Sequence, residues 1–108
     1  MSEIKIEMIQ GLCQNNSVLW STHAVERLQL RGIKRDDVLH AISVGKIIEQ
    51  YPDDHPYPSC LVLGIDLHEQ ILHIVCGSNG NVVKIITAYH PTEDKFDKTG
   101  EFRKEKTS

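Results

Sequence analysis

The sequence lacks the features that would assign it directly to a membrane, secreted or redox-active class. No segment of its 108 residues is apolar and long enough to span a membrane. The residues from Met1 to Lys5 lead into a charged amphipathic segment, so we expect no signal peptide. The three cysteines are odd in number and lack Cys-x-x-Cys spacing. They argue against a disulfide framework and indicate reduced thiols in a cytoplasmic protein.

A basic excess is missing as well. The formal net charge is −3 at pH 7, and the sequence pI is about 6.0. Proteins that bind nucleic acid usually carry a surplus of lysine and arginine, because contacts with phosphate supply much of their affinity. The overall charge therefore counts against a general nucleic-acid surface and leaves a local basic patch as the open alternative.

Patterns typical of metal, phosphate or thiol chemistry are also absent. The six histidines and three cysteines include no pair at zinc-like spacing. His73 and Cys76 are three residues apart on a predicted strand, so they point to opposite faces. The segment Gly77 to Gly80 has no lysine and no following helix, unlike a phosphate-binding loop. We expect no metal ion, no cofactor and no cysteine nucleophile.

The stretch from Leu61 to Pro91 organises the chain. Val, Ile, Leu and Tyr dominate three runs that are separated by turn-forming residues, which indicates three strands. His68-Glu69 can close the first turn, and Asn79-Gly80 tolerates the positive φ that the second turn needs. Two successive hairpins predict an antiparallel meander. The predicted strands cover residues 60–67, 71–76 and 82–90.

The turns also predict a register and therefore two faces. We expect Leu67 to lie opposite Gln70 in the first hairpin. In the second hairpin, Gly77 is expected opposite Val82. The face predicted to meet the core then consists of Leu61, Leu63, Ile65, Leu72, Ile74, Cys76, Val83, Ile85, Thr87 and Tyr89. The polar residues of the opposite face are Asp66, His73, Lys84 and His90. An antiparallel sheet often buries one face only, so this second face either is simply solvated or carries a site.

Helices are predicted before the meander, at residues 2–15, 21–31 and 33–44. Ser2 and either Ser21 or Thr22 are the expected caps of the first two helices. Val18 to Trp20 is a short extended piece that can add an edge strand, and Lys46 to Tyr51 is a further strand. The three prolines between residues 52 and 58 exclude regular structure there. That loop is either a lid over the second face or a plain polar crossover.

The predicted fold is α+β, with N-terminal helices packed on one face of a four-stranded antiparallel meander sheet. Residues 1–92 are expected to form this single domain. After Pro91 the composition becomes almost wholly polar and charged. Residues 93–108 are therefore predicted to be a flexible tail or a segment that becomes ordered on binding a partner.

A basic surface is predicted on the second helix, where His23, Arg27 and Arg31 recur at four-residue spacing and share a face. Such a set suits RNA cleavage through the 2′-hydroxyl. Histidine can act as base or acid, arginine binds phosphate, and tyrosine can stack on a base or donate a proton. The sheet contributes His73, Lys84, Tyr89 and His90 to the same metal-free set. A solvated helix face with no such role is the alternative.

Several segments resemble a bacterial domain family of unassigned function, marked by an H-A-x-x-R helix and a closing T-x-Y-x-P strand. The segments are THAVER at 22–27, RGI at 31–33, GKIIE at 45–49 and ITAYHP at 86–91. That family is similar to the RelE/ParE and BrnT-like toxin superfamily. The resemblance implies a RelE/BrnT-like fold and a messenger-RNA endonuclease toxin. It also implies a partner antitoxin, of the zinc-finger YgiT/MqsA kind in many members.

The resemblance marks three positions as catalytic: His23, Arg27 and Tyr89. The expected RNA-binding residues are Arg31, from the resemblance, and His73, Lys84 and His90, from the predicted register. The alternative is a non-catalytic protein-binding module with the same fold, in which His23 and Arg27 form a structural pair tied to the Tyr89 strand. A concave pocket shared by His23, Arg27 and Tyr89 would favour the enzyme. Burial or scatter of these residues would favour the module. The oligomeric state is left open.

Overall fold

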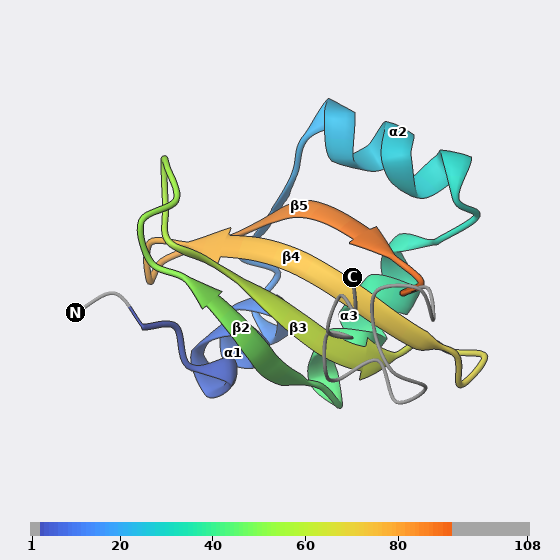
Figure 1. Cartoon of the computed structure of the whole chain (residues 1–108), viewed down its shortest axis with the longest axis horizontal. Coiled ribbons are helices and arrows are strands. Elements are labelled where there is room, and N and C mark those ends of the chain that lie inside the picture. Colours follow the sequence, from blue (N-terminus) through green and yellow to red (C-terminus); the bar gives the residue numbers. More distant parts are fainter. Residues whose placement is uncertain (1–2, 92–108) are drawn as a thin grey trace, which may run out of the picture.

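In the computed structural model, which describes residues 3–91, three helices accompany a five-stranded sheet (Figure 1). The helices are α1 (Ile6–Gln14), α2 (Thr22–Leu30) and α3 (Arg35–Ser43). The strands are β1 (Val18–Trp20), β2 (Lys46–Tyr51), β3 (Ser59–Ile65), β4 (Ile71–Ser78) and β5 (Val83–Tyr89). The α+β class is therefore confirmed. The predicted tail at residues 93–108 lies outside the described residues.

The sheet order is β1-β5-β4-β3-β2. Strands β2 to β5 form the expected antiparallel meander. Strand β1 pairs with β5 in parallel, with Trp20 opposite Ile85. The prediction of a four-stranded, purely antiparallel sheet is wrong in two respects. Within the described residues the sheet has five strands, and β1 and β5 are parallel. The meander leaves the edge of β5 open, and β1 supplies hydrogen-bond partners there: Val83 N donates to Ser17 O at 2.9 Å.

Helices α2 and α3 start within two residues of the predicted positions, whereas α1 starts four residues later. Helix α2 is capped as expected, because Ser21 Oγ accepts a hydrogen bond from Ala24 N at 3.0 Å. Helix α1 begins at Ile6 rather than at the predicted Ser2, which lies outside the described residues. Within residues 3–91, no helix is long and apolar enough to cross a membrane.

Helices α1 and α3 cover one face of the sheet, whereas α2 runs along β5 at the edge (Figure 1). The apolar core fills the space between α1, α3 and the sheet. Helix α3 comes so close to β3 that a Cβ atom at Gly64 would lie 2.0 Å from the Ala41 carbonyl oxygen. The contact between α3 and β3 therefore requires glycine at position 64.

The first hairpin is one residue out of the predicted register, because Ile65 lies opposite Ile71. The loop has three residues rather than two. Asp66 N donates to Gln70 O at 2.9 Å, and Glu69 takes a positive φ of 63°, as three-residue hairpin loops commonly require. The Asp66 carboxylate accepts hydrogen bonds from His68 N at 2.8 Å and Gln70 N at 2.9 Å, which stabilises this loop.

This one-residue register shift places each side chain of β3 on the opposite face of the sheet from the predicted one, since side chains alternate along a strand. Cys60, Val62 and Gly64 meet α3 and the core, in place of the predicted Leu61, Leu63 and Ile65. The predicted core side of β4 is confirmed: Leu72, Ile74 and Cys76 are fully buried on the helix side.

A β-bulge changes the second half of β5. Cys76 lies opposite Ile85, but the preceding Val75 lies opposite Thr87, so Ile86 is an extra residue. Val83 and Ile85 face the core as predicted, and the extra residue then turns Ala88 inward. Thr87 and Tyr89, which were predicted in the core, consequently lie on the face away from α1 and α3. That face is called the second face below.

The cysteines are free thiols. Cys60 and Cys76 are fully buried opposite each other on the core face, with their Sγ atoms 3.9 Å apart. Burial raises the pKa of Cys13 to about 11. The contact with the Cys60 sulfur, together with burial, raises the pKa of Cys76 well above the ordinary thiol value. The Cys13 and Cys76 thiols therefore stay protonated near neutral pH and are poor nucleophiles, whereas the hydrogen bond with Cys76 lowers the pKa of Cys60.

Candidate functional site

A pocket of about 400 Å³ lies between the start of α2, the loop at residues 52–58 and β5. Each of these three elements contributes at least one histidine, tyrosine or lysine side chain. The residues that line the pocket include Ser21, His23, His55, Tyr57, Lys84 and Ile86. Among the described residues that line this pocket, none carries a carboxylate. Its lining is therefore neutral to cationic, although the chain as a whole is acidic.

The 52–58 loop forms one wall of the pocket because it is attached to the sheet at its C-terminal end. Ser78 N donates to Pro58 O at 3.1 Å, and Ser59 Oγ donates to the Asp54 carboxylate. A Cβ atom at Gly77 would lie 3.2 Å from Pro58 O, so the loop and β4 approach closely. Of the two interpretations of this loop, the arrangement supports a wall over the second face rather than a plain crossover.

His23 and Arg27 are joined on the surface of α2. Arg27 Nε donates to His23 Nε2 at 2.8 Å, and both side chains are exposed. The spacing of four residues places them one turn apart on the same helix face. Accepting this hydrogen bond at Nε2 requires a neutral ring with its proton on Nδ1. His23 lines the pocket, and its bond holds Arg27 beside it.

Arg31 attaches the end of α2 to the sheet. Its Nη1 donates to Thr87 Oγ1 at 2.8 Å and to Ala88 O at 3.0 Å. The structural tie between the second helix and β5, expected of His23 and Arg27 in the binding-module alternative, is thus made by Arg31. Its guanidinium is bonded to the protein's own β5.

Tyr89 and His73 form a separate pair on the second face. They lie opposite each other on β5 and β4, with ring centroids 5.4 Å apart in an edge-to-face contact. His73 is fully buried and Tyr89 is half-buried. Neither residue is among those that line the pocket in the part of the chain described. The structure brings His23, Arg27 and Lys84 together but does not join Tyr89 to them there.

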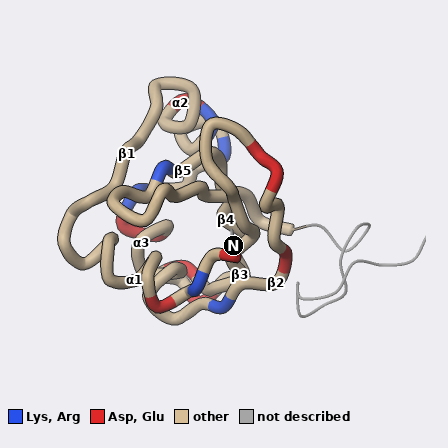
Figure 2. The backbone as a smooth tube through the Cα atoms, turned by 90° about the vertical axis from the view of Figure 1, so that its left-hand side faces the viewer, with Lys and Arg blue, Asp and Glu red and all other residues tan. Residues whose placement is uncertain are grey.

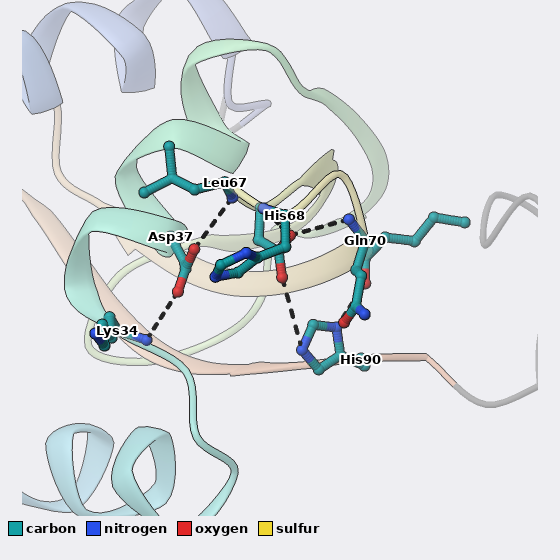
Figure 3. Close-up of polar contacts among 8 residues, drawn as sticks. Lys34, Asp37, Leu67, His68, Gln70 and His90 are labelled. Carbon is teal, nitrogen blue, oxygen red and sulfur yellow. Dashed lines mark hydrogen bonds and ion pairs between the residues drawn. The ribbon is translucent and has the colours of Figure 1, made fainter.

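His90 lies at the opposite end of the sheet, beside the β3–β4 turn (Figure 3). Its Nδ1 is 2.9 Å from Ile71 O, and its Nε2 is 3.9 Å from Asp66 Oδ2. The pocket adjoins Gly77, which pairs with the first residue of β3, whereas Asp66 follows its last. On β5 itself, the pocket-lining Ile86 is four residues before His90, and a strand rises about 3.3 Å per residue, so roughly 13 Å of strand separate them. His90 therefore does not take part in the pocket.

In the described part of the chain, acidic and basic residues are not segregated onto separate surfaces of the molecule. Figure 2 shows acidic and basic positions interspersed around the backbone, with acidic residues on the loop that follows β2. Because opposite charges on a surface offset one another at a distance, attraction for an anion depends on the residues immediately around it. The pocket lining and the adjoining Arg27 supply positive charge of this kind, with Asp53 and Asp54 on the same loop as His55.

His55 and Tyr57 were not among the predicted site residues. The three prolines marked their loop as irregular and as a candidate lid. The contact between this loop and β4 involves residues twenty positions apart, Pro58 and Ser78. The predicted hairpin ended at Cys60 and Cys76, so it included neither this contact nor the position of the rest of the loop.

The fold and pocket define a small single-sheet α+β domain with one helix placed along a sheet edge. The chain belongs to the family described as a domain of unknown function (DUF4258), whose model matches residues 20–90. The match extends from β1 to the end of β5 and so includes every element around the pocket. No curated protein and no solved structure matches the chain. The expectation of a domain family without assigned function is confirmed, and the relation to toxins stays a prediction.

Proposed function

We propose that the pocket binds RNA and that the protein is a metal-independent endoribonuclease, the toxin-like component of a toxin–antitoxin system. One observation carries the proposal. The hydrogen-bonded His23 and Arg27 stand at a pocket that also contains Lys84 and, among its described lining residues, no carboxylate. A RelE/ParE- or BrnT-like relationship belongs to this proposal.

Phosphate binding follows from the cations and from the start of α2. Lys84 supplies a point charge, and Arg27 supplies a planar fork of N–H donors that matches two phosphate oxygens. Ser21 and His23 lie at the N-terminus of α2, where the helix dipole also favours an anion. Tyr57 and Ile86 offer an aromatic ring and an apolar surface against which an unpaired base can stack.

His23 is the general base of the proposed reaction. Its Nε2 bears a lone pair in this arrangement because it accepts the bond from Arg27. When an RNA phosphate enters, Arg27 turns to a phosphate oxygen and frees Nε2 to take the proton of the 2′-hydroxyl. Both side chains are exposed, so the exchange disturbs no buried contact. Arg27 then stabilises the charge that builds up on the phosphate in the transition state.

A non-catalytic protein-binding module is the second candidate, and it is favoured by the separation of Tyr89 from the pocket and by an apolar groove. The groove has a volume of about 340 Å³ and is lined by Val44, Leu63, Ile65 and Ile71, together with Lys46 and Gly64. Val44 and the nearby Leu67 are 55% and 56% exposed, and exposed apolar patches commonly mark partner surfaces. The partner of the toxin-like candidate is an antitoxin protein, with a zinc-finger type as the expected kind, whereas the module docks a protein of another class.

The test is inducible expression in a bacterial host. The growth rate of the cells is measured, and the 5′ ends of their RNA are mapped. The wild type is compared with His23→Ala and Arg27→Ala. His68→Ala is the matched control, because His68 is exposed at the far end of the sheet. We expect growth arrest and new RNA 5′ ends with the wild type and the control, and neither with the two pocket variants.

Two results would overturn the enzyme proposal. In the first, cells grow normally while the wild-type protein accumulates in soluble, folded form, which leaves the binding module. In the second, His23→Ala fails to fold, which makes His23 a structural residue. Circular dichroism of each purified variant separates loss of fold from loss of activity.

A further inference from the structure

Two histidines from different elements line the same pocket. His23 belongs to α2, and His55 belongs to the 52–58 loop. Lys84 of β5 lines the pocket with them. The side chain of His55 is exposed, so it can exchange protons with solvent. The hydrogen bond from Ser78 N to Pro58 O holds the loop against β4 and keeps His55 on the pocket wall.

We propose that His55 is the second proton-transfer residue of this pocket, so that RNA is cleaved between one histidine from α2 and one from the loop. The inference rests on the proposed function and deepens it. It names the substrate as RNA whose 2′-hydroxyl is the nucleophile. The products are a 2′,3′-cyclic phosphate and a 5′-hydroxyl end.

The atoms of the step balance as follows. His23 Nε2 takes the proton of the 2′-hydroxyl, and the 2′-oxygen forms a new bond to phosphorus. The bond between phosphorus and the 5′-oxygen breaks, and that oxygen receives its proton from the protonated ring of His55. Lys84 and Arg27 offset the negative charge on the non-bridging oxygens. Proton exchange with water then restores both rings, so no metal ion, oxidant or reductant is consumed.

Histidine suits the acid role better than the other proton donors that line the pocket. Tyr57 and Lys84 also carry acidic protons, but tyrosine and lysine side chains generally titrate more than about 3 pH units above histidine. An acid works best when its titration lies near the working pH, because it must both give up a proton and regain one in each cycle. Tyr57 and Lys84 are better suited to stacking and to charge stabilisation.

The experiment varies the leaving group. Purified wild type, His55→Ala, His55→Gln, His23→Ala and the control His68→Ala are assayed on oligoribonucleotides and on the four nucleoside 3′-(4-nitrophenyl phosphates). Nitrophenolate leaves without a proton, so this substrate needs the base but not the acid. Removal of a general acid typically costs about 10² to 10⁴-fold. We expect such a loss for both His55 variants on RNA, near-normal rates on the activated esters, and loss on both substrates for His23→Ala.

The remaining outcomes separate the inference from the proposed function. If the wild type cleaves RNA and the His55 variants cleave it equally well, His55 has no part in the reaction while the ribonuclease proposal stands. Equal losses of the His55 variants on RNA and on the activated esters would show that the loop only shapes the pocket, which also overturns the acid role. A wild type that cleaves neither substrate overturns the proposed function itself.

Discussion

The two ends of the sheet use polar side chains in opposite ways. At the turn end, formed by Asp37, the Asp66 turn and His90, buried carboxylates bind backbone N–H groups (Figure 3). Asp37 accepts hydrogen bonds from Lys34 N at 3.2 Å and Leu67 N at 3.1 Å. At the pocket end, formed by the start of α2, the 52–58 loop and Lys84, His23 and Arg27 are exposed and bonded to each other.

The difference indicates which polar residues hold the fold and which are available to a ligand. Asp37 and Asp66 are 6% and 5% exposed, and their oxygens already satisfy the backbone of α3 and of the turn. Removing either would leave backbone donors without their partners. His23 and Arg27 can exchange partners without loss of any buried contact, as a binding or catalytic site requires. Substitutions at the turn end should therefore affect stability more than substitutions at the pocket end.

The largest effect is expected for Gly64→Ala at the turn end. The added Cβ would lie 2.0 Å from Ala41 O, so α3 and β3 must move apart, at a cost of about 3 kcal/mol in the free energy of unfolding. Urea denaturation measures this loss. Gly11→Ala in α1 is the matched control, because nothing lies within 4 Å of its Cβ position. That control should gain about 0.5 to 1 kcal/mol from the better helix propensity of alanine. Equal stabilities of the two variants would contradict the close contact.

Asp66→Ala should lower the free energy of unfolding by about 2 kcal/mol, because the turn loses two hydrogen bonds to a charged acceptor. Thermal and urea denaturation measure the change. Asp36→Ala is the control: Asp36 is exposed in the first turn of α3, and its loss should cost about 0.5 kcal/mol. RNA cleavage by folded Asp66→Ala should match that of the wild type. Reduced cleavage by this variant at a temperature where it is fully folded would contradict the separation of the two ends.

The turn end should also lose stability in acid. Burial acts to raise the pKa of the Asp66 carboxyl, but hydrogen bonds from Gln70 N and His68 N, with the charges of the His90 and His68 rings, hold that pKa below its usual value. A lowered pKa in the folded state stabilises the protein above the unfolded value of about 3.9, and this contribution disappears as pH falls below it. The urea midpoint of the wild type should therefore fall below about pH 4 more steeply than that of Asp66→Asn. Parallel curves would show that Asp66 makes no such contribution.

The smallest effects on stability are expected at the pocket end. Arg27→Ala and His23→Ala should change the free energy of unfolding by less than about 0.5 kcal/mol, because exposed side chains contribute little. Arg31→Ala on the same helix removes the bonds to Thr87 and Ala88 and should cost about 1 kcal/mol. Differential scanning calorimetry can resolve this difference. A larger loss for Arg27→Ala than for Arg31→Ala would make Arg27 the structural residue.

Local sequence patterns predicted most of the elements of this fold. The β-rich runs and the Asn-Gly pair placed the meander, Ser21 marked the start of α2, and KIIEQY matched β2 at both ends. The faces of the strands were predicted less well. The carboxylate of Asp66 closes a three-residue loop where two residues were assumed, and the extra Ile86 in β5 reverses the side-chain direction after Ile85. The first shift depends on the hydrogen bonds of Asp66 and the second on a β-bulge, and the two-residue periodicity of a strand encodes neither.

The candidate site was predicted only in part. Regular spacing on one helix was enough to group His23, Arg27 and Arg31, and the structure joins the first two and places Lys84 at the same pocket. The contribution of His55 depends on how the loop folds back onto β4, which is a contact between distant residues. His90 is separated from the pocket because it contacts the β3–β4 turn, a contact between residues about twenty positions apart in the sequence. Contacts of both kinds arise only once the chain is folded.

The most direct test of the account is the cleavage of one synthetic RNA, measured together with the melting temperature, for wild type, His23→Ala and His68→Ala. The same sequence with 2′-deoxy sugars serves as the substrate control. We predict that wild type and His68→Ala cleave the RNA and leave the deoxy strand intact. His23→Ala should be slower by about 10² to 10⁴-fold at an unchanged melting temperature. Uncut RNA with folded wild type, or equal losses for the two histidine variants, would contradict the account.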